Sequence, residues 1–101
     1  MIDLKKLQKD VYQNKLNKGF NVTDLNVEFC LLYGEVGEAV QAYYKKLPDL
    51  GEELADIAIY LLGISEILGI DLEDEILKKM DKNKKRVYKE VDGKFVKVEN
   101  L

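Results

Sequence analysis

Apolar residues recur at a helical spacing through most of this 101-residue chain. The pattern predicts four helices, with Thr23 capping the second, Gly69 closing the third and Asp71 capping the fourth. Pro48 falls in the turn between the second and third helices. The expected helices span about 3–15, 24–46, 52–68 and 72–86.

The third helix is apolar on nearly every side in its centre, 54-LADIAIYLLGI-64, and this pattern predicts a helix that is buried all round. Asp56 would then be an acid embedded in the protein interior. In the fourth helix, Ile76, Leu77 and Met80 are expected to face inward.

The period changes in the tail, 87–99, where β-forming residues surround Asp92-Gly93, a strong hairpin signal. A two-stranded hairpin alone is marginally stable, so it would need to pack on the helices or on another subunit. We therefore expect an all-α fold: a four-helix bundle with a short C-terminal β-hairpin. It would form a single domain over 1–101, with a helical core at about 3–86.

Composition favours a cytoplasmic protein. The longest apolar run, 57-IAIYLLGI-64, is too short to span a bilayer, and the N-terminus lacks a signal-peptide core, so no membrane partner is expected. The single cysteine, Cys30, cannot form an internal disulfide, and its apolar surroundings favour burial. A domain this small buries a modest share of its surface, so self-association would help it.

Charge is distributed unevenly although the net charge is only −3. Residues 28–75 carry twelve acids and two lysines, whereas residues 76–101 carry nine basic residues and four acids. The middle is suited to cations and the last segment to an anion, although solvated helix faces would also explain the pattern. The acidic middle makes nucleic-acid binding unlikely.

Four carboxylates carry the candidate chemistry: Glu35 and Glu38 on the second helix, and Glu53 and Asp56 on the third. Residues three apart share a helix face, and an antiparallel helix pair would bring the two pairs together. Converging acids repel one another, and a bound hard cation removes that cost; Mg²⁺ is the first choice, with Mn²⁺ a possible substitute. Zinc and di-iron sites are disfavoured because the chain has no histidine.

Two glycines, Gly34 and Gly37, lie among these acids although each costs a helix about 1 kcal/mol. They would let a neighbouring backbone or a substrate approach the acids, and tight helix packing explains them equally well. On the fourth helix, Lys79, Asn83 and Arg86 form one stripe that could bind phosphate oxygens. The alternative is a basic helix end that complements the helix dipole.

These motifs together resemble the MazG-like all-α nucleoside triphosphate pyrophosphohydrolases. The resemblance covers about residues 25–86. Members usually begin the first motif with two glutamates, and Gly34 takes the place of one of them; Glu28 is a candidate to compensate. The motifs are 35-EVGE-38, 53-ELAD-56 with the following IAIYLLGI, and 70-IDLEDEILKKMDKNKKR-86.

The resemblance implies a homodimer or a dimer of dimers that hydrolyses an NTP or dNTP to the monophosphate and pyrophosphate with Mg²⁺, a house-cleaning activity on the nucleotide pool. It implies that the four carboxylates bind metal and that the stripe on the fourth helix binds nucleotide. Glu38 is our candidate to accept the proton of the attacking water. The alternative is a non-catalytic helical oligomer that binds nucleotide or a protein partner.

Overall fold

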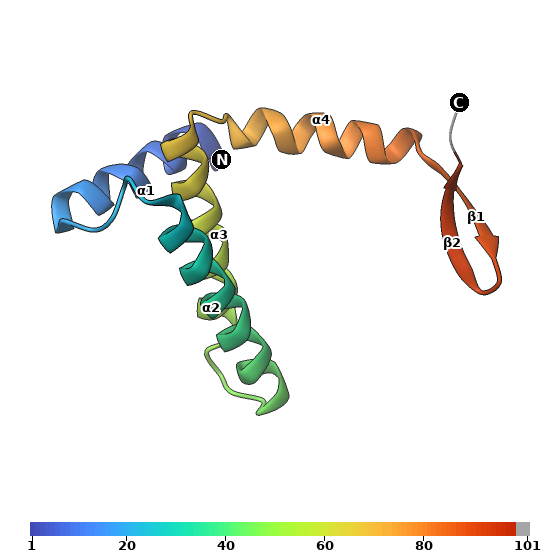
Figure 1. Ribbon diagram of the computed structural model, residues 1–101, viewed down its shortest axis with the longest axis horizontal. Helices are drawn as coiled ribbons and strands as arrows, with labels where there is room; N and C mark the ends of the chain where they lie inside the picture. The colour runs from blue at the N-terminus through green and yellow to red at the C-terminus, as the bar shows by residue number, and fades with distance from the viewer. Residues whose placement is uncertain (99–101) are drawn as a thin grey trace.

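The computed structural model describes residues 1–98 and contains four helices followed by a two-stranded hairpin (Figure 1). The predicted all-α fold with its terminal hairpin is therefore confirmed; the predicted end of the hairpin, residue 99, lies outside the described residues. The elements are α1 (Leu4–Lys18), α2 (Leu25–Tyr44), α3 (Leu50–Leu68), α4 (Leu72–Lys85), β1 (Val87–Val91) and β2 (Lys94–Val98).

Short-range capping sets the helix ends. The side chains of Asp24 and Asp71 accept hydrogen bonds from backbone N–H groups in the first turns of α2 and α4. The N-cap of α2 is therefore Asp24, and the prediction of Thr23 was wrong by one residue. Gly19 and Gly69 end α1 and α3 in the left-handed conformation that glycine adopts without a steric penalty.

Helices α2 and α3 form an antiparallel pair, and α1 crosses the end of α3 (Figure 1). Gly63 lies at this crossing, since a Cβ placed there would be 3.5 Å from Val11 Cγ1. The apolar core is small and consists of Ala39, Ala42, Leu62 and Ile64.

Helix α4 extends away from the other three helices, and contacts with α1 hold its first turn in place. The buried side chain of Gln8 on α1 donates to the carbonyl of Ile70 at 2.6 Å and accepts from the backbone N–H of Leu72 at 3.2 Å. Lys5 lies 3.3 Å from Asp71 and 3.4 Å from Asp74. These contacts attach the start of α4 to α1, and the rest of α4 extends away from the α2–α3 pair (Figure 1).

Three burial predictions were wrong for the single chain. Helix α3 is not buried all round, since Leu54, Ile59 and Leu61 are exposed. Ile76, Leu77 and Met80 on α4 are also exposed, and so is Cys30. The reason is geometric: each helix of the pair is covered on one side by its partner, and α4 extends away instead of closing the other side.

The hairpin turns at Asp92-Gly93 as predicted, with φ values of 51° and 77°, typical of a type I′ turn. Val87 pairs with Val98 at its open end, and every residue of β1 is exposed. Within residues 1–98, the hairpin has no extensive packing against α1, α2 or α3. None of the described helices combines the length and apolarity needed to cross a membrane.

Candidate metal centre

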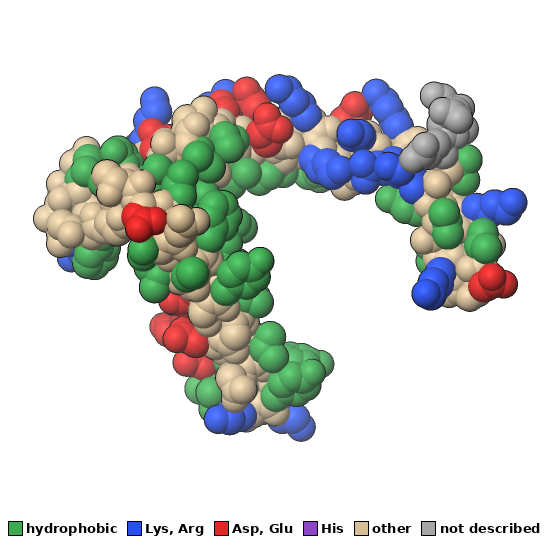
Figure 2. Space-filling model, viewed as in Figure 1, with side chains coloured by type: hydrophobic (Ala, Val, Ile, Leu, Met, Phe, Trp, Pro, Cys, Tyr) green, Lys and Arg blue, Asp and Glu red, His purple; other side chains and the backbone are tan. Residues whose placement is uncertain are grey.

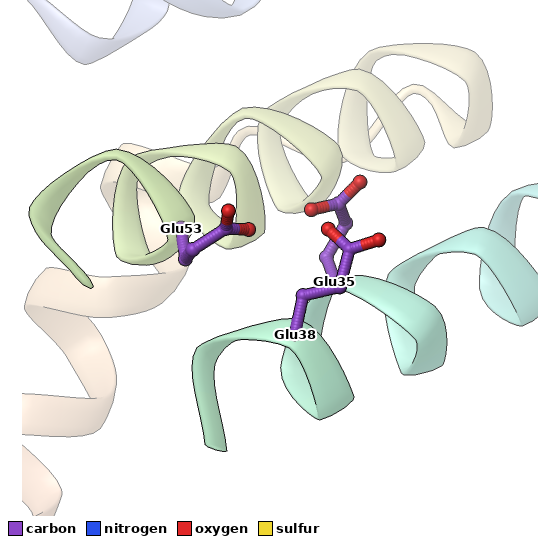
Figure 3. A group of neighbouring side chains, drawn as sticks. All are labelled: Glu35, Glu38 and Glu53. Atoms are coloured by element: carbon purple, nitrogen blue, oxygen red, sulfur yellow. The ribbon is translucent and has the colours of Figure 1, made fainter. Parts of the chain in front are cut away.

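Three of the four predicted carboxylates converge between α2 and α3. Glu35 and Glu38 extend from α2 and Glu53 from α3, toward one another (Figure 3). One carboxylate oxygen from each residue lies within 4.8 Å of the others. The cluster follows from the three-residue spacing on α2 and from the antiparallel pairing of the two helices.

The carboxylates of the cluster are partly buried and repel one another. Burial raises the pKa of Glu35, and the neighbouring charges of Glu38 and Asp56 raise it further. Burial likewise raises the pKa of Glu53, and the charges of Glu38 and Asp49 raise it further. Neither carboxylate gains a compensating cation from the described chain, because none of the ion pairs in residues 1–98 involves them.

Three buried oxygens in this region have no hydrogen-bond partner: Oε2 of Glu35, Oε2 of Glu53 and Oδ1 of Asp49. A buried carboxylate oxygen normally accepts a hydrogen bond or binds a cation. Only oxygen ligands are present in the cluster, which is the donor set that Mg²⁺ and Mn²⁺ prefer. The residues therefore fit a hard divalent cation.

Asp56 does not belong to the converging set and is exposed, so its predicted position as an embedded acid was wrong. Its charge nevertheless contributes to the raised pKa of Glu35, which places it beside the cluster.

Asp49 was missed from the sequence. It precedes α3 at the N-cap position, yet its side chain makes no capping hydrogen bond, and its charge helps to raise the pKa of Glu53. The spacing of Asp49, Glu53 and Asp56 at i, i+4 and i+7 is the signal that could have revealed it, because these positions share one helix face.

Gly34 and Gly37 line an open groove of about 490 Å³ next to the carboxylates. A Cβ placed on either glycine would meet nothing within 4 Å. The two glycines therefore do not serve tight helix packing within the chain, and they leave space for a molecule from outside it. The groove is also lined by Glu38, Gln41, Ala42, Leu47, Asp49 and Glu53.

Glu28 is not free to replace the acid that Gly34 lacks. It is 1% exposed and forms an ion pair with Lys15, while Asn21 Nδ2 donates to its other oxygen at 3.1 Å. Lys15 also lies 5.6 Å above the ring of Tyr60. Burial raises the pKa of Tyr60, and the charges of Glu35 and Glu28 add to this shift.

The predicted cationic stripe lies on α4 and its C-terminal end, apart from the carboxylates of the same chain (Figures 1 and 2). Arg86 Nη1 donates to Asn83 Oδ1 at 3.2 Å. The positive charge of Arg86 lowers the pKa of Lys79, with smaller contributions from burial and from Lys82. A concentration of positive charge that depresses a lysine pKa is suited to an anion.

Comparison with family models matches residues 29–90 to the MazG nucleotide pyrophosphohydrolase domain. The matched segment contains both the carboxylate cluster and the stripe on α4. Comparisons with curated proteins and with solved structures give no match. Because the family model covers more than half of the chain, this protein belongs to the MazG nucleotide pyrophosphohydrolase family.

Proposed function

We propose that the protein is a Mg²⁺-dependent nucleoside triphosphate pyrophosphohydrolase that converts an NTP or dNTP to the monophosphate and pyrophosphate. One observation carries the proposal: carboxylates from two helices converge with buried, unpartnered oxygens in a chain of this family. Glu35, Glu38, Glu53 and Asp56 are the proposed metal ligands, and Asp49 is a further candidate. Mn²⁺ is a possible substitute, because it accepts the same oxygen ligands.

A bound divalent ion would neutralise charge on the phosphate oxygens and lower the pKa of a bound water. The reaction itself needs a water oxygen to bond to the α-phosphorus while the bond from that phosphorus to the α,β-bridging oxygen breaks. Pyrophosphate leaves with the bridging oxygen. Glu38 is the most exposed member of the cluster and lines the groove, so we assign it the role of accepting the proton of the attacking water.

The open groove beside Gly34 and Gly37 gives a triphosphate access to the carboxylates. Lys79, Asn83 and Arg86 are the proposed nucleotide-binding residues. Lysine and arginine pair with phosphate oxygens, and arginine does so through two parallel hydrogen bonds. Since positioning and electrostatics supply most of the catalysis in phosphoryl transfer, these groups complement the metal ligands.

Pyrophosphate release from a panel of NTPs and dNTPs, with and without Mg²⁺, tests the proposal. At least one nucleotide should be cleaved, and chelation should abolish cleavage. If no nucleotide is cleaved at high protein concentration, the protein is instead a non-catalytic member that binds nucleotide or a protein partner.

A matched pair of variants tests the ligand assignment. Glu53→Gln keeps the side-chain shape but removes the charge. It should reduce turnover by more than about a hundredfold, because the metal supplies several kcal/mol and each tenfold in rate is about 1.4 kcal/mol. Glu52→Gln changes the neighbouring residue, which lies outside the cluster, and should retain turnover. Full turnover of Glu53→Gln would contradict the assignment.

A further inference from the structure

The C-terminal hairpin continues directly from α4, and the junction determines which hairpin side chains lie near the cationic stripe. Arg86 is the C-cap residue of α4 and already has an extended backbone, with φ −72° and ψ 139°. Side chains alternate between the two sides of an extended chain, so Arg86 and Tyr88 point to the same side. Arg86 therefore belongs both to the stripe on α4 and to one face of the hairpin.

The strand register adds Lys97 to that face. Tyr88 lies opposite Lys97, and residues opposite each other in an antiparallel pair have their side chains on the same face. The turn at Asp92-Gly93 sets this register, and a shift by one residue would move Lys97 to the other face. The hairpin therefore holds Arg86, Tyr88 and Lys97 on one side.

Lys97 also acts electrostatically on the stripe. The charge of Arg86 is the largest cause that lowers the pKa of Lys79, followed by burial. The charges of Lys82 and Lys97 lower the pKa of Lys79 further, whereas Tyr88 raises it. Figure 2 shows Lys and Arg side chains gathered where α4 meets the hairpin. The lysine of β2 is thus a spatial neighbour of the stripe on α4.

These cations converge without a matching acid. Within residues 1–98, none of the ion pairs involves Lys79, Arg86 or Lys97. The acid on the same face of the hairpin, Glu90, lies opposite Phe95 and therefore nearer the turn. Like charges that lie together repel one another, and a bound polyanion removes that cost. The junction of α4 and the hairpin therefore fits a chain of phosphates.

We propose that Lys97 is a third phosphate-binding residue and that it makes the site selective for triphosphates over diphosphates. A triphosphate carries one phosphate more than a diphosphate, and a third cation supplies a partner for the added negative charge. The match to the family model ends at residue 90, so Lys97 lies outside the matched segment. The inference rests on the proposed function, in which Lys79 and Arg86 bind the nucleotide.

Binding of inorganic tripolyphosphate and of pyrophosphate, measured by calorimetry in a chelator at low ionic strength, tests the site apart from catalysis. The wild type should prefer tripolyphosphate. Lys97→Met should weaken tripolyphosphate binding about tenfold, because one charge-assisted hydrogen bond is lost, and should affect pyrophosphate less.

Lys89→Met is the matched control, because it removes the same charge from the opposite face of the same hairpin. It should leave both affinities nearly unchanged. Equal losses in Lys97→Met and Lys89→Met would mean that only net charge matters and would overturn the proposal. A wild type without measurable affinity for tripolyphosphate would overturn it as well.

A swap of two residues tests position at constant charge. The double variant Val96→Lys, Lys97→Val keeps the composition and moves the ammonium group to the other face of β2. Val96 is exposed, so the strand can accept a lysine there. The swap should weaken tripolyphosphate binding as Lys97→Met does, and Lys97→Arg should retain it. Wild-type affinity in the swap would overturn the proposal; if the swap unpairs the strands, the single variants still decide.

Kinetics separate this inference from the proposed function. In Lys97→Met the KM for the triphosphate should rise about tenfold, whereas the inhibition constant of the corresponding diphosphate should change little. An active wild type whose KM is unchanged by Lys97→Met would overturn the inference and leave the proposed function standing. If the wild type is inactive but Lys97→Met still weakens tripolyphosphate binding, the proposed function is wrong and Lys97 remains a phosphate-binding residue.

Discussion

Lys15 Nζ lies 2.5 Å from Glu28 Oε1 in an ion pair that joins α1 to α2, with the Glu28 side chain 1% exposed. The pair occupies Glu28, the acid that the sequence suggested as a substitute for the glutamate missing at Gly34. Its role is therefore to hold α1 against the α2–α3 pair, next to Tyr60.

Removal of the lysine should be costly. Lys15→Met leaves a buried carboxylate with only Asn21 as a partner, and breaking one half of a buried ion pair costs about 3–5 kcal/mol. Denaturant unfolding measures the loss, and Lys9→Met on the exposed side of α1 is the control, with a change within about 0.5 kcal/mol. Equal effects of the two substitutions would mean that the pair is not a structural contact.

Without metal, the carboxylate cluster should destabilise the protein as pH rises. The pKa of Glu53 is raised above its ordinary 4.5 in the folded chain, so the folded state binds the proton more tightly than the unfolded state. The tighter proton binding of folded Glu53 adds to the free energy of unfolding. This stabilisation is fully present below about pH 4.5 and is lost as pH rises through the pKa of Glu53 in the folded state.

Thermal unfolding in a chelator measures this effect. Glu53→Gln should match the Tm of the wild type at about pH 4 and should have the higher Tm at about pH 8, where the wild-type carboxylate is charged. Mg²⁺ should raise the Tm of the wild type more than that of Glu53→Gln, by mass action on the folded state. Glu52→Gln should behave as the wild type does; a Tm for Glu53→Gln below wild type at high pH would contradict the expected repulsion.

Gly34→Ala should stabilise the chain by up to about 1 kcal/mol, because the helix gains propensity and the added Cβ meets nothing within 4 Å. The same methyl group narrows the groove, so the KM for the nucleotide should rise. Gly51→Ala, near the start of α3 and outside the groove, should leave KM unchanged. Loss of stability in Gly34→Ala would instead indicate that another copy's backbone packs against this glycine.

Gln8→Leu should cost about 1–3 kcal/mol, since it leaves the N–H of Leu72 and the carbonyl of Ile70 without their partner. Without these contacts, α4 should vary in its direction relative to α3. Distances between spin labels on α3 and α4 would then show a broader distribution than in the wild type. Gln13→Leu removes a single exposed hydrogen bond to Asn17 and should change neither quantity. A narrow, unchanged distribution in Gln8→Leu would show that other contacts fix the direction of α4.

The sequence by itself determined the helices, the hairpin and the candidate carboxylates. Periodicity and capping act over a few residues, so Asp71, Gly69 and Asp92-Gly93 could be assigned their positions in advance. The spacing of Glu35 and Glu38, and the short connection to Glu53, were enough to predict the carboxylate cluster.

The tertiary structure decided what depends on contacts between distant residues. The direction of α4 is set by Gln8, which is 62 residues from Ile70 along the chain, and no local pattern carries that information. The same direction leaves Met80 exposed. The exact rotation of α3 places Asp49 beside the cluster and Asp56 at its exposed edge. Periodicity reports which helix face is apolar, but only packing determines which neighbour, if any, covers it.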